Sequence, residues 1–319
     1  MPEAEADWAT AVVSRPVEGE TVGEGGQPCP VCGADTEWAG ACHGRFVGRA
    51  FQLRRCPDCR FVFVADPWLD YERIYDAAYY AGRGVDTRMN IAGESRDPAR
   101  SIRRCEWLGV EQCVGSLVNL TPESTWLDYG CGAGGLVAFL RARGYSGARG
   151  FEPSSAAHEL IAPSVDPLTV DQLAELCGHF DVVSAIDVIE HVPDPVTELT
   201  RMCSLLRPGG LLFITTGNAR PHRDHLARWR YLKPEVHISL FEPATLALAL
   251  ERAGLRPEFP GYGPGWTGII RYRILKELGR RRTSPVDRLV PWSLLCRLVD
   301  RRVGLSAQPV GWNAAAPGA

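Results

Sequence analysis

The sequence predicts an α/β protein whose central domain is a parallel sheet with crossover helices, preceded by a small module held by cysteines. Three observations predict this class. From Thr125 onward, short apolar runs alternate with amphipathic helical patterns, which is typical of parallel strands joined by helices. A glycine-rich turn, GCGAGG, follows the first of these runs at residues 130–135. Two C-x-x-C pairs stand near the start of the chain.

The composition narrows the class of protein. A chain of 319 residues with 45% hydrophobic and 23% charged residues suits a core domain with smaller appendages. Its formal net charge of −3 gives no overall electrostatic reason to expect a nucleic acid or a membrane as partner. No apolar stretch approaches the ~18 residues of a membrane span, and we find no signal-peptide pattern. Eleven cysteines, mostly single within apolar runs, indicate free thiols in a reducing cytoplasm.

Four cysteines predict a metal site in the front module. They are Cys29, Cys32, Cys56 and Cys59. The 23-residue gap between the two pairs suits a β-hairpin, because RFVGRAFQLRRC and RFVFVADP alternate like strands. Four thiolates can hold zinc tetrahedrally, and such a closed site leaves no open position for chemistry, so we expect a zinc ribbon with a structural metal. Cys42 and His43 lie between the pairs and are either a spare ligand or a loop pair.

The elements of the central domain follow from its hydrophobic pattern. The expected strands are residues 125–129, 147–152, 167–170, 180–186 and 211–216, with a final strand at 307–313. The expected helices are residues 136–144, a helix capped by Ser154 or Ser155, and residues 196–207 and 242–254.

The glycine turn predicts a cofactor site. Gly130, Gly132 and Gly134 let the backbone pass close to a ligand at the carboxyl end of the first strand. Glu152 ends the next strand, where a carboxylate can accept both hydroxyl protons of a ribose. Asp128 stands two residues before the glycine run, and its charge would repel phosphates and suit an amino group. This combination favours S-adenosylmethionine over a dinucleotide.

Four motifs in order resemble those of class I S-adenosylmethionine-dependent methyltransferases: LDYGCGAGG, GFEPS, FDVVSAIDVIEHVPDP and LLRPGGLLFITTGN. The resemblance implies a Rossmann-like, seven-stranded sheet with a reversed last strand. It implies that Asp128 and the three glycines line the amino-acid and sulfonium end of the cofactor, while Glu152 holds the ribose. The other cofactor contacts that it implies are Asp171 and Gln172 at the adenine, and Ile186 and Asp187 after the fourth strand.

The front module makes this resemblance more specific. CPVCG, RCPDCRFVFVADP and YDAAYY are similar to the zinc-ribbon opening of bacterial methyltransferases that serve glycan or natural-product biosynthesis, including sugar C-methylation. The ribbon is then expected to be a scaffold and a cap on the substrate side. Sugar C-methyltransferases of this group carry a long further C-terminal domain that this sequence does not contain, which makes C-methylation the less favoured alternative.

Two histidines are the candidate bases for the acceptor. His191 follows the fourth strand and His237 lies on the connection after the fifth, so both border the mouth of the cofactor site. Histidine suits proton removal because its pKa lies near neutrality. The sugar C-methyltransferases have histidines at both places and an acid before the second, where this chain has Val236. Either histidine alone would more often be structural, but two on one cleft favour catalysis, and we rank His237 first.

The sequence also places other candidate residues near the acceptor. His222 and His225 are weaker candidates for the base, and Tyr79 and Tyr80 either reach over the acceptor or pack together. The turn after the fourth strand reads AIDVIEHV and not Asn-Pro-Pro-aromatic, which argues against methylation of a base amino group. The Asp and Asp-Asn set of metal-dependent catechol methylation is not found either. We therefore expect a hydroxyl acceptor on a small molecule.

Two further functions are compatible with the sequence. An RNA methyltransferase could grip nucleic acid with the arginines of the ribbon, although the acidic balance of the chain argues against it. A non-catalytic protein could keep S-adenosylmethionine only as a structural ligand. The basic residues Arg271, Arg273, Lys276, Arg280, Arg281 and Arg282 form either a solvated helical face or a surface for a membrane or an anionic substrate.

The chain divides into five expected segments. They are residues 1–27, disordered; 28–68, the zinc ribbon; 69–120, a helical linker and substrate cap; 121–262, the S-adenosylmethionine-binding domain; and 263–319, C-terminal helices inserted before a final strand and a tail. The sequence does not predict the oligomeric state.

Overall fold

The computed structural model describes residues 27–84, 101–161, 165, 167–261, 263–277, 289–295 and 310–313. The segment expected to be disordered lies outside these ranges except for Gln27, and so do Arg280, Arg281 and Arg282. Within the described ranges, no helix is long and apolar enough to cross a membrane. The cysteines of the same ranges are free thiols.

The main sheet combines parallel strands with one reversed strand. Its order is β5-β4-β6-β7-β10-β9. The strands are β4 (Trp126–Tyr129), β5 (Ala148–Phe151), β6 (Phe180–Ile186), β7 (Leu206–Thr215), β9 (Leu255–Glu258) and β10 (Val310–Asn313). β4 to β7 run parallel, whereas β10 pairs antiparallel with β7 and with β9. The reversed strand expected near the end of the chain is therefore β10, and the fold is a Rossmann-like α/β sheet.

The described part of this sheet has six strands where seven were expected. The expected third strand is reduced to one parallel bridge between Leu168 and Phe151, in which the Leu168 N–H donates to the Gly150 carbonyl at 2.7 Å. Two neighbours explain the shortening. Pro167 has no N–H to pair, and Thr169 caps the helix α8 (Val170–Ala174), so only Leu168 is left to extend the sheet.

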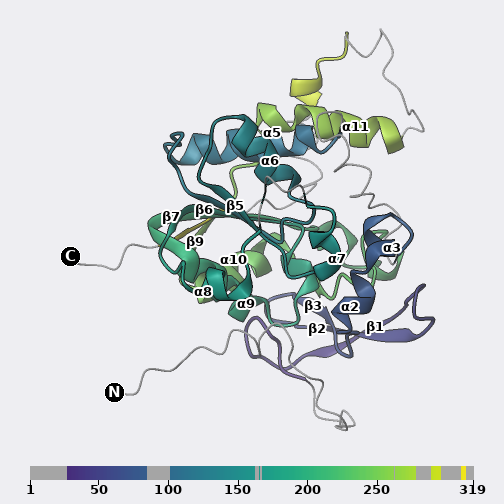
Figure 1. Ribbon diagram of the computed structural model, residues 1–319. Helices are drawn as coiled ribbons and strands as arrows, with labels where there is room; N and C mark the ends of the chain where they lie inside the picture. The colour runs from purple at the N-terminus through teal and green to yellow at the C-terminus, as the bar shows by residue number, and fades with distance from the viewer. Residues whose placement is uncertain are drawn as a thin grey trace, which may run out of the picture.

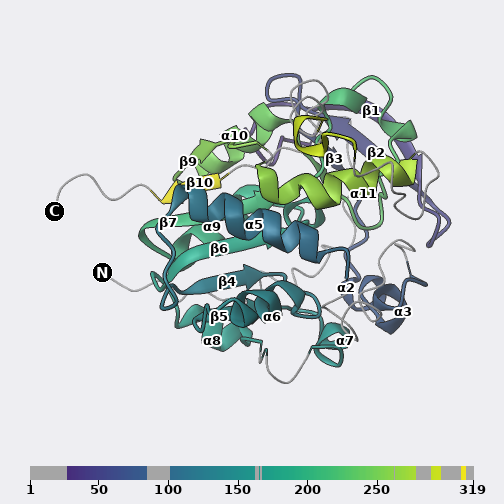
Figure 2. The same cartoon turned by 90° about the horizontal axis from the view of Figure 1, so that it is seen from above.

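Helices cover both faces of the main sheet (Figures 1 and 2). On one face lie α5 (Arg104–Leu117), α6 (Gly135–Ala142) and α11 (Thr267–Glu277), and on the other lie α8, α9 (Pro195–Leu205) and α10 (Pro243–Arg252). Each layer buries its own hydrophobic cluster against the sheet, one around Trp107 and Leu136 and the other around Leu199 and Leu246. The three layers leave the carboxyl ends of β4, β5 and β6 at one edge.

The front module forms a second sheet that borrows a strand from the central domain. Its order is β1-β2-β3-β8, with β1 (Glu37–His43), β2 (Ala50–Arg55), β3 (Val62–Val64) and β8 (Ser239–Leu240). The sequence pattern predicted β2 and β3 but not β1, whose small residues and bulge between Trp38 and Gly40 hide its alternation. Phe61 and Phe63 belong to the same hydrophobic cluster as Leu199, so the module and the central domain share one core.

Short helices flank the carboxyl edge of the main sheet. α2 (Tyr71–Ile74) and α3 (Ala77–Tyr80) follow the front module, and α7 (Ser155–His158) follows β5. Tyr79 and Tyr80 pack on Ala157 of α7 in a small buried cluster. A single helical turn, η1 (Ile189–His191), follows β6. These pieces surround the place where the sequence predicts a cofactor.

Candidate active site

The glycine turn after β4 requires glycine at its first and last positions. Gly130 and Gly134 both have φ of 75°, and Gly132 has φ of 55°. A Cβ atom on Gly130 would lie 2.7 Å from Val188 Cγ2, and one on Gly134 would lie 2.8 Å from Val165 Cγ1. Side chains are thus excluded by conformation and by space. Gly134 is also the N-cap of α6, so the turn leads directly into a helix N-terminus at the sheet edge.

Glu152 lies against this turn. Its carboxylate accepts hydrogen bonds from the backbone N–H of Gly132 at 2.8 Å and from that of Ser154 at 2.9 Å. The side chain is 8% exposed, and burial raises the pKa of Glu152 although these two N–H donors oppose the shift. An acid that ends β5 therefore faces the glycines that end β4, at a place suited to a ribose.

Asp128 is buried behind the glycine turn. Its Oδ1 accepts from the Ser184 hydroxyl at 2.9 Å, and the same hydroxyl accepts from Trp126 Nε1 at 3.0 Å. Burial raises the pKa of Asp128 to about 7, and the nearby cation of Arg103 acts in the opposite direction. Arg103 was not predicted from the sequence, because this residue stands just before α5 and far from every recognised motif.

His191 and His237 meet at the same edge. Their ring centroids lie 4.9 Å apart with the planes at 67°. His191 Nδ1 lies 2.8 Å from the Val236 carbonyl, and His237 Nδ1 bonds the Tyr231 carbonyl. A carbonyl oxygen can only accept, so the proton of a neutral His237 ring is on Nδ1 and its Nε2 is unprotonated. His191 also forms a backbone hydrogen bond to Asp187.

Both histidines are neutral near pH 7. Burial lowers the pKa of His191, and burial together with the neighbouring His191 lowers the pKa of His237 well below its usual range. His237 is 7% exposed. A neutral His237 with an unprotonated Nε2 is suited to accept a proton from a bound hydroxyl.

Two side chains beside the histidines, one buried and one half-buried, were not predicted from the sequence. Glu190 is fully buried and accepts hydrogen bonds from the Tyr231 hydroxyl and, at 2.8 Å, from the Thr216 hydroxyl. Tyr75 places its hydroxyl 2.9 Å from His191 Nδ1. Glu190 stands next to His191 in the sequence, which was a usable signal. Tyr75 lies in an irregular stretch after the front module, where no periodic pattern marks it.

The other acceptor candidates lie around this site. Tyr79 packs edge-to-face on Tyr75, with ring centroids 5.0 Å apart. Tyr79 and Tyr80 form a T-shaped pair with centroids 5.2 Å apart, within the cluster that packs on α7. His222 stacks on Trp229 at 4.9 Å. His225 is exposed.

One tyrosine joins the histidine pair to the cofactor side. The Tyr75 hydroxyl reaches His191, and the Tyr75 carbonyl accepts a hydrogen bond from the Ser154 hydroxyl at 3.1 Å. The N–H of the same Ser154 donates to Glu152. The ribose position and the candidate base therefore border a single site.

The four cysteines of the front module converge. Their Sγ atoms all lie within 4.8 Å of one another, with Cys29 and Cys59 at 3.5 Å and Cys32 and Cys56 at 3.3 Å. Zn–S bonds of ~2.3 Å in a tetrahedron require sulfur–sulfur distances of roughly 3.8 Å, so the donor set fits zinc. Cys42 and His43 do not belong to the cluster.

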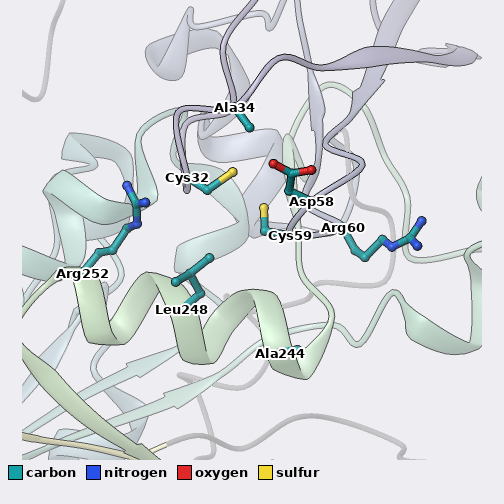
Figure 3. Close-up of a pocket in the computed structure, with 8 residues that line it drawn as sticks. All are labelled: Cys32, Ala34, Asp58, Cys59, Arg60, Ala244, Leu248 and Arg252. Carbon is teal, nitrogen blue, oxygen red and sulfur yellow. The ribbon is translucent and has the colours of Figure 1, made fainter.

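The cysteine cluster borders a groove against α10. Cys32 and Cys59 line it from the front module, and Ala244, Leu248 and Arg252 line it from α10 (Figure 3). The Thr245 hydroxyl of α10 also donates to the Cys59 carbonyl. The cluster therefore packs on the central domain.

Comparison with known proteins decides what the central domain is. Residues 101–258 match a family of methyltransferase domains. The chain contains a class I S-adenosylmethionine-dependent methyltransferase domain. This domain includes the glycine turn, Glu152 and both histidines, whereas the four cysteines precede it.

Curated relatives of this methyltransferase domain include ubiquinone biosynthesis O-methyltransferases. The protein of Pseudomonas paraeruginosa is 38% identical over an alignment of 106 residues, and the match covers 30% of this chain and 46% of that protein. The protein of Caulobacter vibrioides is 35% identical over an alignment of 138 residues, and the match covers 35% of this chain and 54% of that protein. The chain thus spans about half the length of these relatives.

Two solved structures are similar to this chain at low sequence identity and low TM-score. The YcgJ protein of Bacillus subtilis is 16% identical with a TM-score of 0.43, covering 66% of this chain and 99% of that chain. A geranyl diphosphate methyltransferase bound to sinefungin is 17% identical with a TM-score of 0.44, covering 64% of this chain and 77% of that chain.

The remaining predicted cofactor contacts of the methyltransferase domain differ in their placement. Asp171 and Gln172 are exposed on the first turn of α8, and the Gln172 side chain accepts from the Thr169 N–H at 2.9 Å. Ile186 ends β6, and Asp187 follows with φ of 53°. The N–H of Asp187 donates to the Thr215 carbonyl at 3.0 Å, which fixes the turn between β6 and η1.

Proposed function

We propose that the chain transfers a methyl group from S-adenosylmethionine to a hydroxyl oxygen of a small molecule, either a sugar, a glycan or a natural product. The observation that carries the proposal is the pair of neutral histidines beside the glycine turn and Glu152, joined through Tyr75 and Ser154. The match to the methyltransferase domain family supports the cofactor. The relatives named as O-methyltransferases support a hydroxyl acceptor.

The chain offers a group to each part of the cofactor. Gly130, Gly132 and Gly134 form a cradle in which two of the positions have no space for a Cβ atom. Glu152 is placed to accept from the ribose hydroxyls, and Asp128 is placed to face the ammonium group. Asp171, Gln172, Ile186 and Asp187 complete the proposed set around the adenine and the pocket wall. The bound cofactor supplies an electrophilic methyl group.

The acceptor side supplies the base. His237 Nε2 would take the proton of the acceptor hydroxyl, so that the oxygen could accept the methyl group with S-adenosylhomocysteine as the leaving group, and the Tyr231 carbonyl fixes the ring through Nδ1. His191 is the second ring of the site and borders the cofactor side through Tyr75. Val236 stands where sugar C-methyltransferases carry an acid, which favours oxygen as the acceptor atom.

We propose a structural zinc ion in the front module. Cys29, Cys32, Cys56 and Cys59 would hold it, because their spacing in the structure fits a closed tetrahedral site. We expect one zinc per chain in protein prepared without chelator, measured by elemental analysis. Protein that is folded and free of metal would contradict this assignment.

Replacing Glu152 with alanine is expected to weaken S-adenosylmethionine binding by about ten- to a hundredfold. The change removes charge-assisted hydrogen bonds to the ribose worth roughly 1.5–3 kcal/mol. Calorimetric titration measures the affinity, and Glu123→Ala, a change at an exposed acid of the same domain, is the matched control. Equal affinities for both variants would place the ribose elsewhere.

Cofactor affinity is expected to rise with pH through about 7. Burial raises the pKa of Asp128 to about 7, so its carboxyl is neutral below this pH and charged above it. Only the charged form attracts an ammonium group, so binding at lower pH must first release a proton. Titrations at about pH 6 and 8 measure the difference, which Asp128→Asn should abolish. A pH-independent affinity in the wild type would show that Asp128 does not face the ammonium group.

A further inference from the structure

The segment that carries His237 is held on both sides by the front module. Two residues before it, Glu235 Oε1 accepts a hydrogen bond from the Phe46 N–H of the β1–β2 loop at 2.9 Å. One residue after it, the Ile238 carbonyl accepts from the Val64 N–H of β3 at 2.9 Å. The chain then continues as β8, which pairs with β3. The candidate base thus stands two residues before a strand of the second sheet.

Other groups of residues 235–238 form hydrogen bonds with the methyltransferase site. The Val236 carbonyl accepts from His191, and the His237 ring bonds the Tyr231 carbonyl. The Ile238 N–H donates to the Glu190 carbonyl at 2.8 Å. Residues 235–238 therefore join the front module to the histidine pair, and each residue contacts one side or both.

Glu235 is unusual for a residue that binds a surface loop. It is only 3% exposed, and a buried carboxylate without a donor costs free energy, so its bond to Phe46 is strongly favoured. The loop closes tightly on it, since a Cβ atom on Gly44 would lie 2.3 Å from Glu235 Oε1. The proposed mechanism assigns no role to this carboxylate.

We propose that Glu235 is a positioning residue for His237, and that the front module acts in methyl transfer by fixing the acceptor base. The inference rests on the proposed function, in which His237 takes the acceptor proton. Catalysis requires the base within hydrogen-bond reach of the acceptor, and a displacement of about 1 Å can lower a rate about 10²-fold. Among the hydrogen bonds of the described residues, none joins the front module to the glycine turn.

The test compares Glu235→Ala with Glu235→Gln. The alanine variant loses the acceptor for the Phe46 N–H, and we expect its kcat to fall roughly ten- to a hundredfold with S-adenosylmethionine affinity unchanged. The glutamine variant keeps a carbonyl oxygen at the same place, so it should retain most of the rate. Glu37→Ala, a change at an exposed acid of β1, is the control for general damage to the module.

A second readout does not depend on turnover. In ¹⁵N-histidine-labelled protein, the resonance that disappears in His237→Ala should report a ring protonated on Nδ1. Glu235→Gln should preserve this signature, and Glu235→Ala should shift it toward a mixture of tautomers. If wild-type protein methylates nothing, the proposed function fails, but the ring signature still decides whether Glu235 positions His237.

Removing the metal from the full-length protein is a third test. Chelation should lower kcat and disturb the His237 signature while calorimetry still detects S-adenosylmethionine binding, and added zinc should restore both. A Glu235→Ala protein with wild-type rate and a wild-type His237 signature would overturn the proposal. A loss of rate that Glu235→Gln fails to rescue, with the ring signature unchanged, would overturn it as well.

Discussion

Replacing His237 with alanine is expected to lower the methylation rate by roughly 10²–10⁴-fold, the usual contribution of a positioned general base. Cofactor affinity should barely change, because the ring contacts Tyr231 and His191 and not the glycine turn. Single-turnover rates and calorimetry measure the two quantities separately. His225→Ala, a change at an exposed histidine of the same connection, is the matched control.

The pH dependence gives an independent check on the same residue. Burial lowers the pKa of His237 well below its usual range. With saturating S-adenosylmethionine at each pH, the wild-type rate should therefore stay level as the pH falls through about 6.5 and decline only below it, where the base becomes protonated. A His237→Ala enzyme with full rate would leave His191, or alignment without a base, as the source of catalysis.

Replacing Phe61 with alanine is expected to destabilise the whole chain by about 3–5 kcal/mol. Phe61 is fully buried, with ring centroids 5.7 Å from Phe63 and 5.1 Å from Phe241. It therefore fills the core shared by the front module and the central domain. Denaturant unfolding measures the change, and Trp38→Ala, at a side chain 59% exposed, is the control.

The outcome also tests how the two parts are coupled. A shared core predicts that Phe61→Ala shifts the unfolding of both parts together. Two separate transitions, with only the front module weakened, would contradict a shared core. A loss below about 1 kcal/mol would show that the site collapses around the missing ring.

The central domain could be predicted from the sequence because its signals are local. The apolar run at 180–186 is β6 itself, and Gly134 ends the turn before α6 as its N-cap. The convergence of His191 and His237 also followed from strand order, since the connections after adjacent parallel strands meet at one edge. The predicted third strand is a single bridge in the structure, because Pro167 and the cap at Thr169 leave one residue to pair.

The rest of the site depends on contacts between distant parts of the chain. Tyr75 contacts His191, which lies 116 residues later, and Glu235 binds Phe46, which lies 189 residues earlier. No periodic pattern encodes such pairs. The sequence showed the front module as separate from the methyltransferase domain, whereas β8 joins the two parts in one sheet.

The most direct test of the account is transfer of an isotope-labelled methyl group from S-adenosylmethionine to the small-molecule fraction of the cells that make this protein. The account predicts a labelled product carrying a new O-methyl group, with an equal amount of S-adenosylhomocysteine, and a loss of both with His237→Ala. Tight binding of S-adenosylmethionine without any labelled product or S-adenosylhomocysteine would contradict it and would identify a non-catalytic binding protein.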